Sequence, residues 1–128
     1  MTDMGIGQPV KRKEDLRFLS GKGQYTDDMN VPGQAYAFIV RSPVAHATIN
    51  SIETSACAST EGVIDVLTSE QFSEYGGLPC GWGINNKDGS PMLEPKHPIL
   101  AEGSVRHVGD PVAVVIAESA EIARDAAE

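Results

Sequence analysis

The chain has 128 residues, of which 41% are hydrophobic and 5% aromatic, and its formal net charge is −8. This length suits one domain whose core is built mainly from Val, Ile, Leu and Ala. The acidic balance would repel phosphates and argues against nucleic acid as a partner, and no apolar run is long enough to span a membrane, so we expect a soluble protein.

The charge is divided unevenly along the chain. Residues 1–25 hold five Lys/Arg against three Asp/Glu, whereas residues 26–128 hold five against fifteen. Residues 1–24 mix Gly, Pro and charge with little periodicity, which predicts an extended N-terminal arm ahead of a domain over residues 25–128. Leu16 and Phe18–Leu19 look helical, and we expect them to pin the arm to an apolar surface.

The domain opens with three alternating or apolar runs. Residues 34–40 predict a strand, bounded by a Val-Pro-Gly turn and by Pro43, and the alternation at 47–52 predicts a second strand. Residues 54–60, rich in Ala and Ser, predict a short helix ended by Gly62. Residues 63–67 (Val-Ile-Asp-Val-Leu) predict a buried strand.

A short helix and then a long loop follow. Thr68 and Gln71 have the spacing of a capping box and predict a helix start. Residues 76–96 contain five Gly and three Pro with no period. They predict a long loop, and long ordered loops are uncommon without a function.

The last part of the chain predicts two strands and a helix. Residues 105–108 and 112–117 are the strands, split by a Gly-Asp-Pro turn, and Ser119 has the position of a helix cap. The last residues place Ile122 and three alanines on one helical face. Because no Gly or Pro ends this helix before Glu128, we expect the domain to be truncated there.

Two cysteines, Cys57 and Cys80, are too few and too far apart for a disulfide framework or a zinc knuckle. They indicate reduced thiols in a cytoplasmic protein. His46, His97 and His107 are too scattered to suggest a shared metal. We therefore predict no metal-binding residues on this chain.

Ser42 and His46 invite comparison with a nucleophile and its base. Nucleophilic catalysis needs a third group that orients the base, and no motif supplies one. The alternative is that Arg41, Ser42 and His46 bond to the backbone of a tight loop or face a neighbouring domain. We predict no catalytic and no cofactor-binding residues, and take these three as candidate interface residues.

Trp82 lies in the glycine-rich loop 76–96. Exposed together with its apolar neighbours, it would line a substrate channel or a subunit contact; folded back, it would only cover its own domain. Trp82 is our fourth candidate interface residue.

Three segments together resemble a known family. They are residues 21–28 (GKGQYTDD), 41–49 (RSPVAHATI) and 105–115 (VRHVGDPVAVV), preceded by a lead-in at 7–18. In order and spacing they resemble the opening domain of the large, molybdenum-binding subunit of the xanthine dehydrogenase, aldehyde oxidase and aerobic carbon monoxide dehydrogenase family. The chain departs from the family pattern at Val44, Thr48 and Glu61.

The resemblance implies a fold of the α+β class, the α/β-hammerhead, a small mixed β-sheet with packed helices. It implies a non-catalytic structural or interface domain of an oxidoreductase that hydroxylates aldehydes or N-heterocycles, or oxidises carbon monoxide, with oxygen from water. The parent subunit would bind molybdenum–molybdopterin (cytosine dinucleotide), with Fe-S and FAD centres on partner chains or domains.

The implied partners are the molybdenum-binding domains of the same chain and the small iron-sulfur and medium flavin subunits. The isolated chain should be inactive, and its uncovered apolar surface should make it self-associate. Two alternatives remain: a carrier-like module, which would present Lys87 or Lys96 at a hairpin tip, and a stand-alone small-molecule binding module that uses loop 76–96.

Overall fold

The computed structural model describes residue 7 and residues 11–128. Contacts between residues divide the chain into two compact units, Met1–Gln34 and Ala35–Glu128. Apart from Gly7, the first ten residues of the predicted arm lie outside the described part.

The described part of the first unit contains two short helices. Helix α1 spans Asp15–Leu19 and the 3₁₀ helix η1 spans Thr26–Asp28. The Phe18 ring stacks on the Tyr25 ring with 5.7 Å between centroids, and the Arg17 guanidinium lies 5.1 Å from the centre of the Phe18 ring. Leu16 and Phe18–Leu19 are helical as predicted, and these aromatic contacts fold the chain locally.

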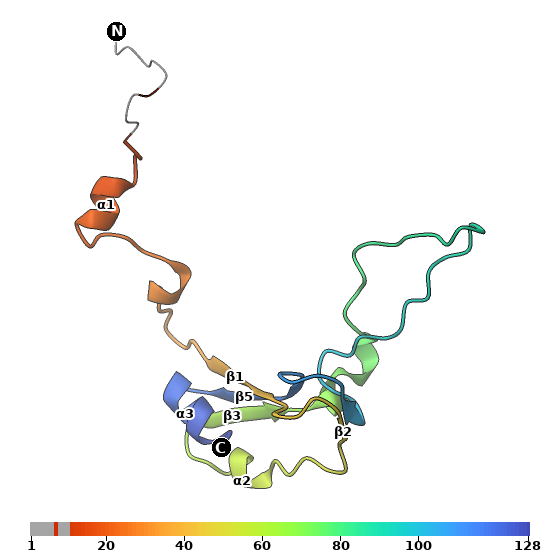
Figure 1. Cartoon of the computed structure of the whole chain (residues 1–128). Helices are drawn as coiled ribbons and strands as arrows, with labels where there is room; N and C mark the ends of the chain where they lie inside the picture. Colours follow the sequence, from red (N-terminus) through yellow and green to blue (C-terminus); the bar gives the residue numbers. More distant parts are fainter. Residues whose placement is uncertain (1–6, 8–10) are drawn as a thin grey trace. The chain divides into compact units, whose positions relative to one another are not determined.

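A three-stranded sheet forms the centre of the second unit (Figure 1). Strand β5 (Pro111–Ala117) lies between β1 (Tyr36–Arg41) and β3 (Val63–Leu67), and both pairings are antiparallel. The register places Phe38 and Val66 on either side of Val115. The β-branched residues of β5 suit this central position, since they pack well on a pleated surface.

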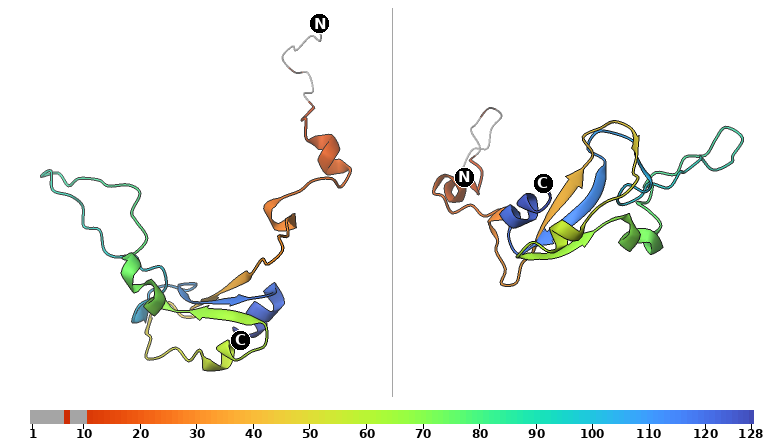
Figure 2. Two further views of the ribbon diagram at one scale, coloured as in Figure 1. Left: turned by 180° about the vertical axis from the view of Figure 1, so that it is seen from behind. Right: turned by 90° about the horizontal axis from the view of Figure 1, so that it is seen from below.

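The core lies on one face of this sheet. Val115 and Ala117 of β5 and Ala123 of helix α3 (Ala120–Asp125) are almost completely buried. Helix α3 packs on β1 and β5, whereas α2 (Ser55–Ala58) packs on β3 (Figure 2). Helix α3 begins where predicted, because the Ser119 hydroxyl accepts a hydrogen bond from the Ile122 N–H at 3.2 Å.

A second, smaller sheet pairs β2 (Ala47–Thr48) with β4 (Ser104–Val105). The 3₁₀ helix η2 (Ser69–Tyr75) follows β3. At its start the Gln71 side-chain oxygen accepts from the Thr68 N–H at 2.7 Å, so the predicted capping pair is confirmed.

The predicted α+β class is confirmed, and three of the predicted strands are corrected. The strand expected at 47–52 has only two residues, and the one expected at 105–108 ends at Val105, where the Arg106 N–H turns to the Asp110 carboxylate. The strand at 63–67 is only partly buried. A register shift between Val63 and Asp65 leaves Ile64 58% exposed.

Within the described residues, no helix is both long enough and apolar enough to cross a membrane.

Gly62 connects α2 to β3 with a backbone φ of +84°, and a Cβ there would lie 2.8 Å from the Ile122 Cδ1 atom. Gly89 has the same φ but open space around it. We expect Gly62→Ala to lower the free energy of unfolding by about 2–4 kcal/mol, since left-handed strain and overpacking add. Gly89→Ala should cost only about 1 kcal/mol. Equal losses in urea denaturation would contradict the contact with α3.

Candidate functional site

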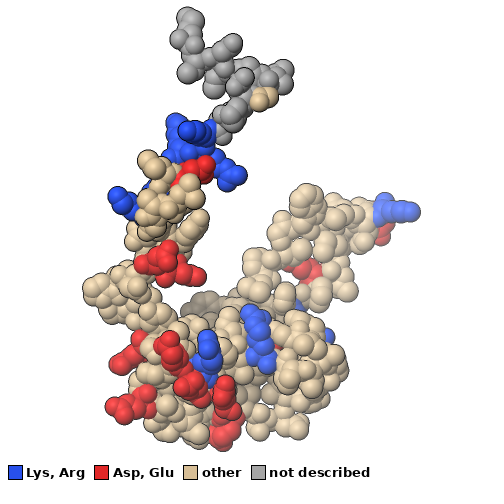
Figure 3. All heavy atoms as spheres, turned by 60° about the vertical axis from the view of Figure 1, so that its left-hand side comes forward, with Lys and Arg blue, Asp and Glu red and all other residues tan. Residues whose placement is uncertain are grey.

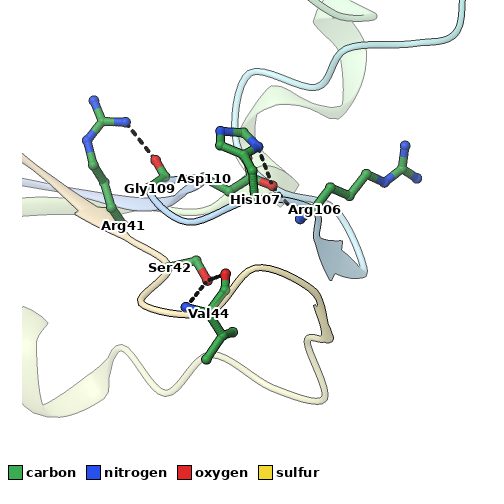
Figure 4. Close-up of polar contacts among 7 residues, drawn as sticks. All are labelled: Arg41, Ser42, Val44, Arg106, His107, Gly109 and Asp110. Carbon is green, nitrogen blue, oxygen red and sulfur yellow. Dashed lines mark hydrogen bonds and ion pairs between the residues drawn. The ribbon is translucent and has the colours of Figure 1, made fainter.

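A set of hydrogen bonds ties the end of β1 to the turn before β5 (Figure 4). The Arg41 guanidinium donates to the Gly109 C=O at 2.9 Å. The Ser42 N–H donates to the Asp110 C=O at 2.9 Å, and the Gly109 N–H donates to the Ser42 C=O at 2.8 Å. We call Arg41, Ser42, Gly109 and Asp110 the loop clamp. It fixes two connections whose bonded residues, such as Arg41 and Gly109, lie up to 68 positions apart in the sequence.

Ser42 is the buried centre of the loop clamp, with 5% of its surface exposed. Its hydroxyl donates to the Val44 C=O at 2.9 Å and accepts from the Val44 N–H at 3.2 Å. Both partners of this hydroxyl are therefore backbone groups of its own turn.

Asp110 holds the opposite side of the loop clamp. Its carboxylate accepts from the Arg106 N–H at 2.8 Å and lies 3.7 Å from Nδ1 of His107. The Arg106 side chain points away from these contacts (Figure 4). Sequence reasoning treated Gly109-Asp110-Pro111 only as a turn. The position of the Asp110 carboxylate, four residues after Arg106, was the signal that it accepts a hydrogen bond from the Arg106 N–H.

The structure brings Arg41 and Ser42 together in the loop clamp but does not join His46 to them. His46 is exposed, and among the described residues no hydrogen bond links it to Ser42. In this arrangement the Ser42 hydroxyl closes a turn. It has no base at hand to accept its proton.

Trp82 lies outside the loop clamp, on the loop 76–96. The loop carries no regular strand and projects from the sheet in the ribbon views (Figures 1 and 2). Trp82 is 77% exposed, and Ile84 and Leu93 are also exposed. The loop therefore presents large apolar side chains away from its own core.

Hydrogen bonds hold this loop from base to tip. The Leu78 N–H donates to the His97 C=O at 2.7 Å at the base, and the Met92 N–H donates to the Ile84 C=O at 3.1 Å in the middle. At the tip, the Ser90 hydroxyl donates to the Asp88 carboxylate at 2.6 Å. The two arms of the loop are therefore bonded to each other, and the loop follows a defined path.

A groove of ≈ 450 Å³ opens at the base of the loop. Leu78, Met92 and prolines line it together with polar residues that include His97 and His107. Its volume falls in the range of ligand sites, which are about 300–1,000 Å³.

Among the described residues, the remaining candidate side chains form neither a metal site nor a disulfide. Cys57 and Cys80 are both free thiols. Over the part of the chain that the structure describes, no three His, Cys, Asp or Glu side chains come together as metal ligands. Lys96 forms an ion pair with Glu102 at 2.7 Å, whereas Lys87 lies in the turn at the loop tip.

Acidic side chains dominate the charge of the second unit. Residues 35–128 hold thirteen Asp/Glu against five Lys/Arg, a net charge of −8. Figure 3 shows acidic side chains gathered on one face of this unit.

Comparisons with known proteins identify the family to which this fold belongs. The profile of the aldehyde oxidase and xanthine dehydrogenase a/b hammerhead domain matches residues 20–128. The chain is 43% identical over 124 residues to the nicotine 6-hydroxylase large subunit of Paenarthrobacter nicotinovorans, covering 96% of this chain and 15% of that protein.

Two solved structures agree with this match. Quinoline 2-oxidoreductase from Pseudomonas putida 86 superposes with a TM-score of 0.80 at 36% identity, over 94% of this chain and 15% of that chain. The Cu,Mo-CO dehydrogenase superposes with a TM-score of 0.75 at 34% identity, over 96% and 14%.

The second unit is therefore an α/β-hammerhead domain. The chain belongs to the aldehyde oxidase and xanthine dehydrogenase family, whose members are oxidoreductases. It spans about one seventh of the length of the relatives that it matches.

If Ser42 acts through the fold, Ser42→Ala should lower the free energy of unfolding by about 1 kcal/mol, the usual value of a lost hydrogen bond. His46→Ala, an exposed matched change in the same loop, should stay within about 0.5 kcal/mol. Chemical denaturation measures both. Losses of equal size would point to a shared interaction between Ser42 and His46.

The hydroxyl and then the backbone N–H of Ser90 lower the pKa of the Asp88 carboxyl below its ordinary value of 3.8. The folded loop therefore favours the carboxylate, and its hold on the tip is lost as the pH falls through this lowered pKa. An NMR titration of Asp88 should give a pKa below 3.8, and Ser90→Ala should raise it. An unchanged pKa in Ser90→Ala would remove Ser90 as the cause.

Proposed function

We propose that this chain is the non-catalytic N-terminal domain of a molybdenum hydroxylase large subunit, where it packs against other domains. One observation carries the proposal. The whole second unit matches a domain that makes up only about one seventh of its relatives. A domain that makes up so small a part of an enzyme contributes chiefly through the surfaces that contact the other domains.

The four candidate interface residues fit two different roles in this proposal. Ser42 and Arg41 set the shape of a surface, because the loop clamp fixes the connection that carries exposed His46. Trp82 makes contact itself, since it stands 77% exposed on a loop with a defined path. Aromatic side chains that become buried when two surfaces meet supply much of the energy of interfaces.

The proposed parent is an oxidoreductase that hydroxylates an aldehyde or an N-heterocycle, or oxidises carbon monoxide. The molybdenum–pterin cofactor would supply the redox chemistry when bound, with Fe-S and FAD centres on partner chains or domains. We propose that no residue of this chain binds this cofactor. The domain boundaries that we propose remain an arm over 1–24 and a domain over 25–128.

A carrier-like module is the second candidate, and one observation favours it. Lys87 lies in the turn at the tip of the projecting loop, where carriers present their modified lysine. Intact-mass measurement after expression with biotin and lipoate distinguishes the two. An adduct that disappears in Lys87→Arg would support the carrier and contradict the interface domain.

If Trp82 makes an interface contact, replacing it should have different effects on stability in the 128-residue chain and in the full-length subunit. In the 128-residue chain, Trp82→Ser should change the free energy of unfolding by less than about 0.5 kcal/mol, because the side chain is exposed. In the full-length subunit the same change should cost about 2 kcal/mol or more, since it empties an interface. Equally small changes in the free energy of unfolding of the two polypeptides would contradict an interface contact at Trp82.

The full-length subunit also provides the control for activity. It should turn over an aldehyde or N-heterocycle with an artificial electron acceptor, whereas the 128-residue chain should not. Turnover by the short chain alone would overturn the proposed non-catalytic role.

A further inference from the structure

The loop 76–96 is the part of the second unit that carries no net charge. It holds two Lys against two Asp/Glu, so the whole net charge of −8 of residues 35–128 lies outside it. Two copies that approach through the rest of this unit bring like charges together, which opposes association. The loop is therefore the surface of the second unit through which two copies of this chain can meet with the least electrostatic repulsion.

Large apolar side chains stand exposed on the same loop. Trp82 is 77% exposed, and Ile84 and Leu93 are 59% and 89% exposed. Trp82 is the only tryptophan of the chain, and a side chain of this kind removes about 150–250 Å² from water when it becomes buried. Exposed apolar side chains of this size on an uncharged segment are typical of a contact with another molecule.

The groove at the base of the loop has apolar walls that suit an aromatic side chain. It has a volume of ≈ 450 Å³, and Leu78, Met92 and three prolines line it. Cys80 also lines it, whereas Trp82 is not among the described residues that do. The loop therefore carries an exposed indole close to an apolar groove that the same indole does not fill.

The polar groups of this groove favour an indole as its occupant. Each of its carboxylates, those of Glu94, Glu102 and Asp110, already accepts a hydrogen bond from a donor of this chain. The Arg106 guanidinium also lines the groove, but it forms no hydrogen bond or ion pair with a described residue, and its side chain points away from Asp110 (Figure 4). A guanidinium binds the face of an aromatic ring, and the indole is the best of these rings.

We propose that two copies of the 128-residue chain associate through this loop, with Trp82 of each copy in the groove of the other copy, against Arg106. Each copy carries both halves of the contact, so a two-fold axis forms both contacts at once and closes the assembly at a dimer. Two buried indoles place the contact at the small end of protein interfaces, and we expect a dissociation constant of about 10–100 µM. The pairing concerns this chain by itself and is independent of the proposed function.

Sedimentation velocity and tryptophan fluorescence measure the association of the intact chain. Between about 5 µM and 1 mM, sedimentation should show a monomer–dimer equilibrium, and the emission of Trp82 should shift to shorter wavelength over the same range. Raising the NaCl concentration from about 50 to 500 mM should strengthen the dimer, because salt screens the repulsion between two net charges of −8.

Two pairs of variants test the two sides of the contact. Trp82→Ser should raise the dissociation constant about tenfold or more, whereas Leu19→Ser, a change at another exposed apolar residue, should leave it within about twofold. Arg106→Ala should raise it about fivefold, since each dimer loses two contacts between a guanidinium and an indole. Arg124→Ala removes an arginine of the same unit outside the groove and should leave the dissociation constant unchanged.

Thiol labelling locates the contact. Cys80 lines the groove and is exposed, so in a Cys57→Ala background the labelling reports on the groove alone. The labelling of Cys80 should slow as the protein concentration rises through the dissociation constant. Adding Trp82→Ser should remove this dependence on concentration.

A chain that stays monomeric at about 1 mM would overturn the proposal and leave the proposed function intact. Association that survives Trp82→Ser but is lost in Leu19→Ser would overturn it in favour of a contact through the N-terminal arm. Growth beyond two copies would indicate a head-to-tail contact and contradict the two-fold pairing.

Discussion

The second unit depends on the burial of β5. This strand pairs with β1 on one side and β3 on the other, and its residues Val115 and Ala117 are almost completely buried in the core. Antiparallel pairing on both sides satisfies its backbone groups, while α3 packs against it. Because β5 holds β1 and β3 in place, the segments that lead to the loop clamp and to the loop 76–96 leave the sheet at fixed positions.

Elements whose local sequence and tertiary packing agree could be predicted from the sequence. Residues 63–67 form a strand with the predicted bounds, and Ser119 caps α3 as its position indicated. In both cases the pattern of side chains and the local backbone preference point the same way. The glycines and prolines of residues 76–96 likewise indicated an irregular path.

Elements determined by contacts between distant residues could not be predicted in this way. The run at 105–108 alternates like a strand, but the Asp110 carboxylate captures the Arg106 N–H and ends β4 at Val105. The backbone bonds of Ser42 to Gly109 and Asp110 join residues far apart in the chain, so residues 41–48 alone did not reveal them.

The strand order has a consequence for synthesis on the ribosome. Tyr36 pairs with Ala117, and Val63 pairs with the same residue, so neither edge strand has its partner until nearly the whole domain has been made. At about 5–20 residues per second, β1 would wait several seconds with its backbone groups and apolar side chains exposed. Nascent chains of this domain therefore pass through an interval in which their unpaired strands are open to chaperones and to one another.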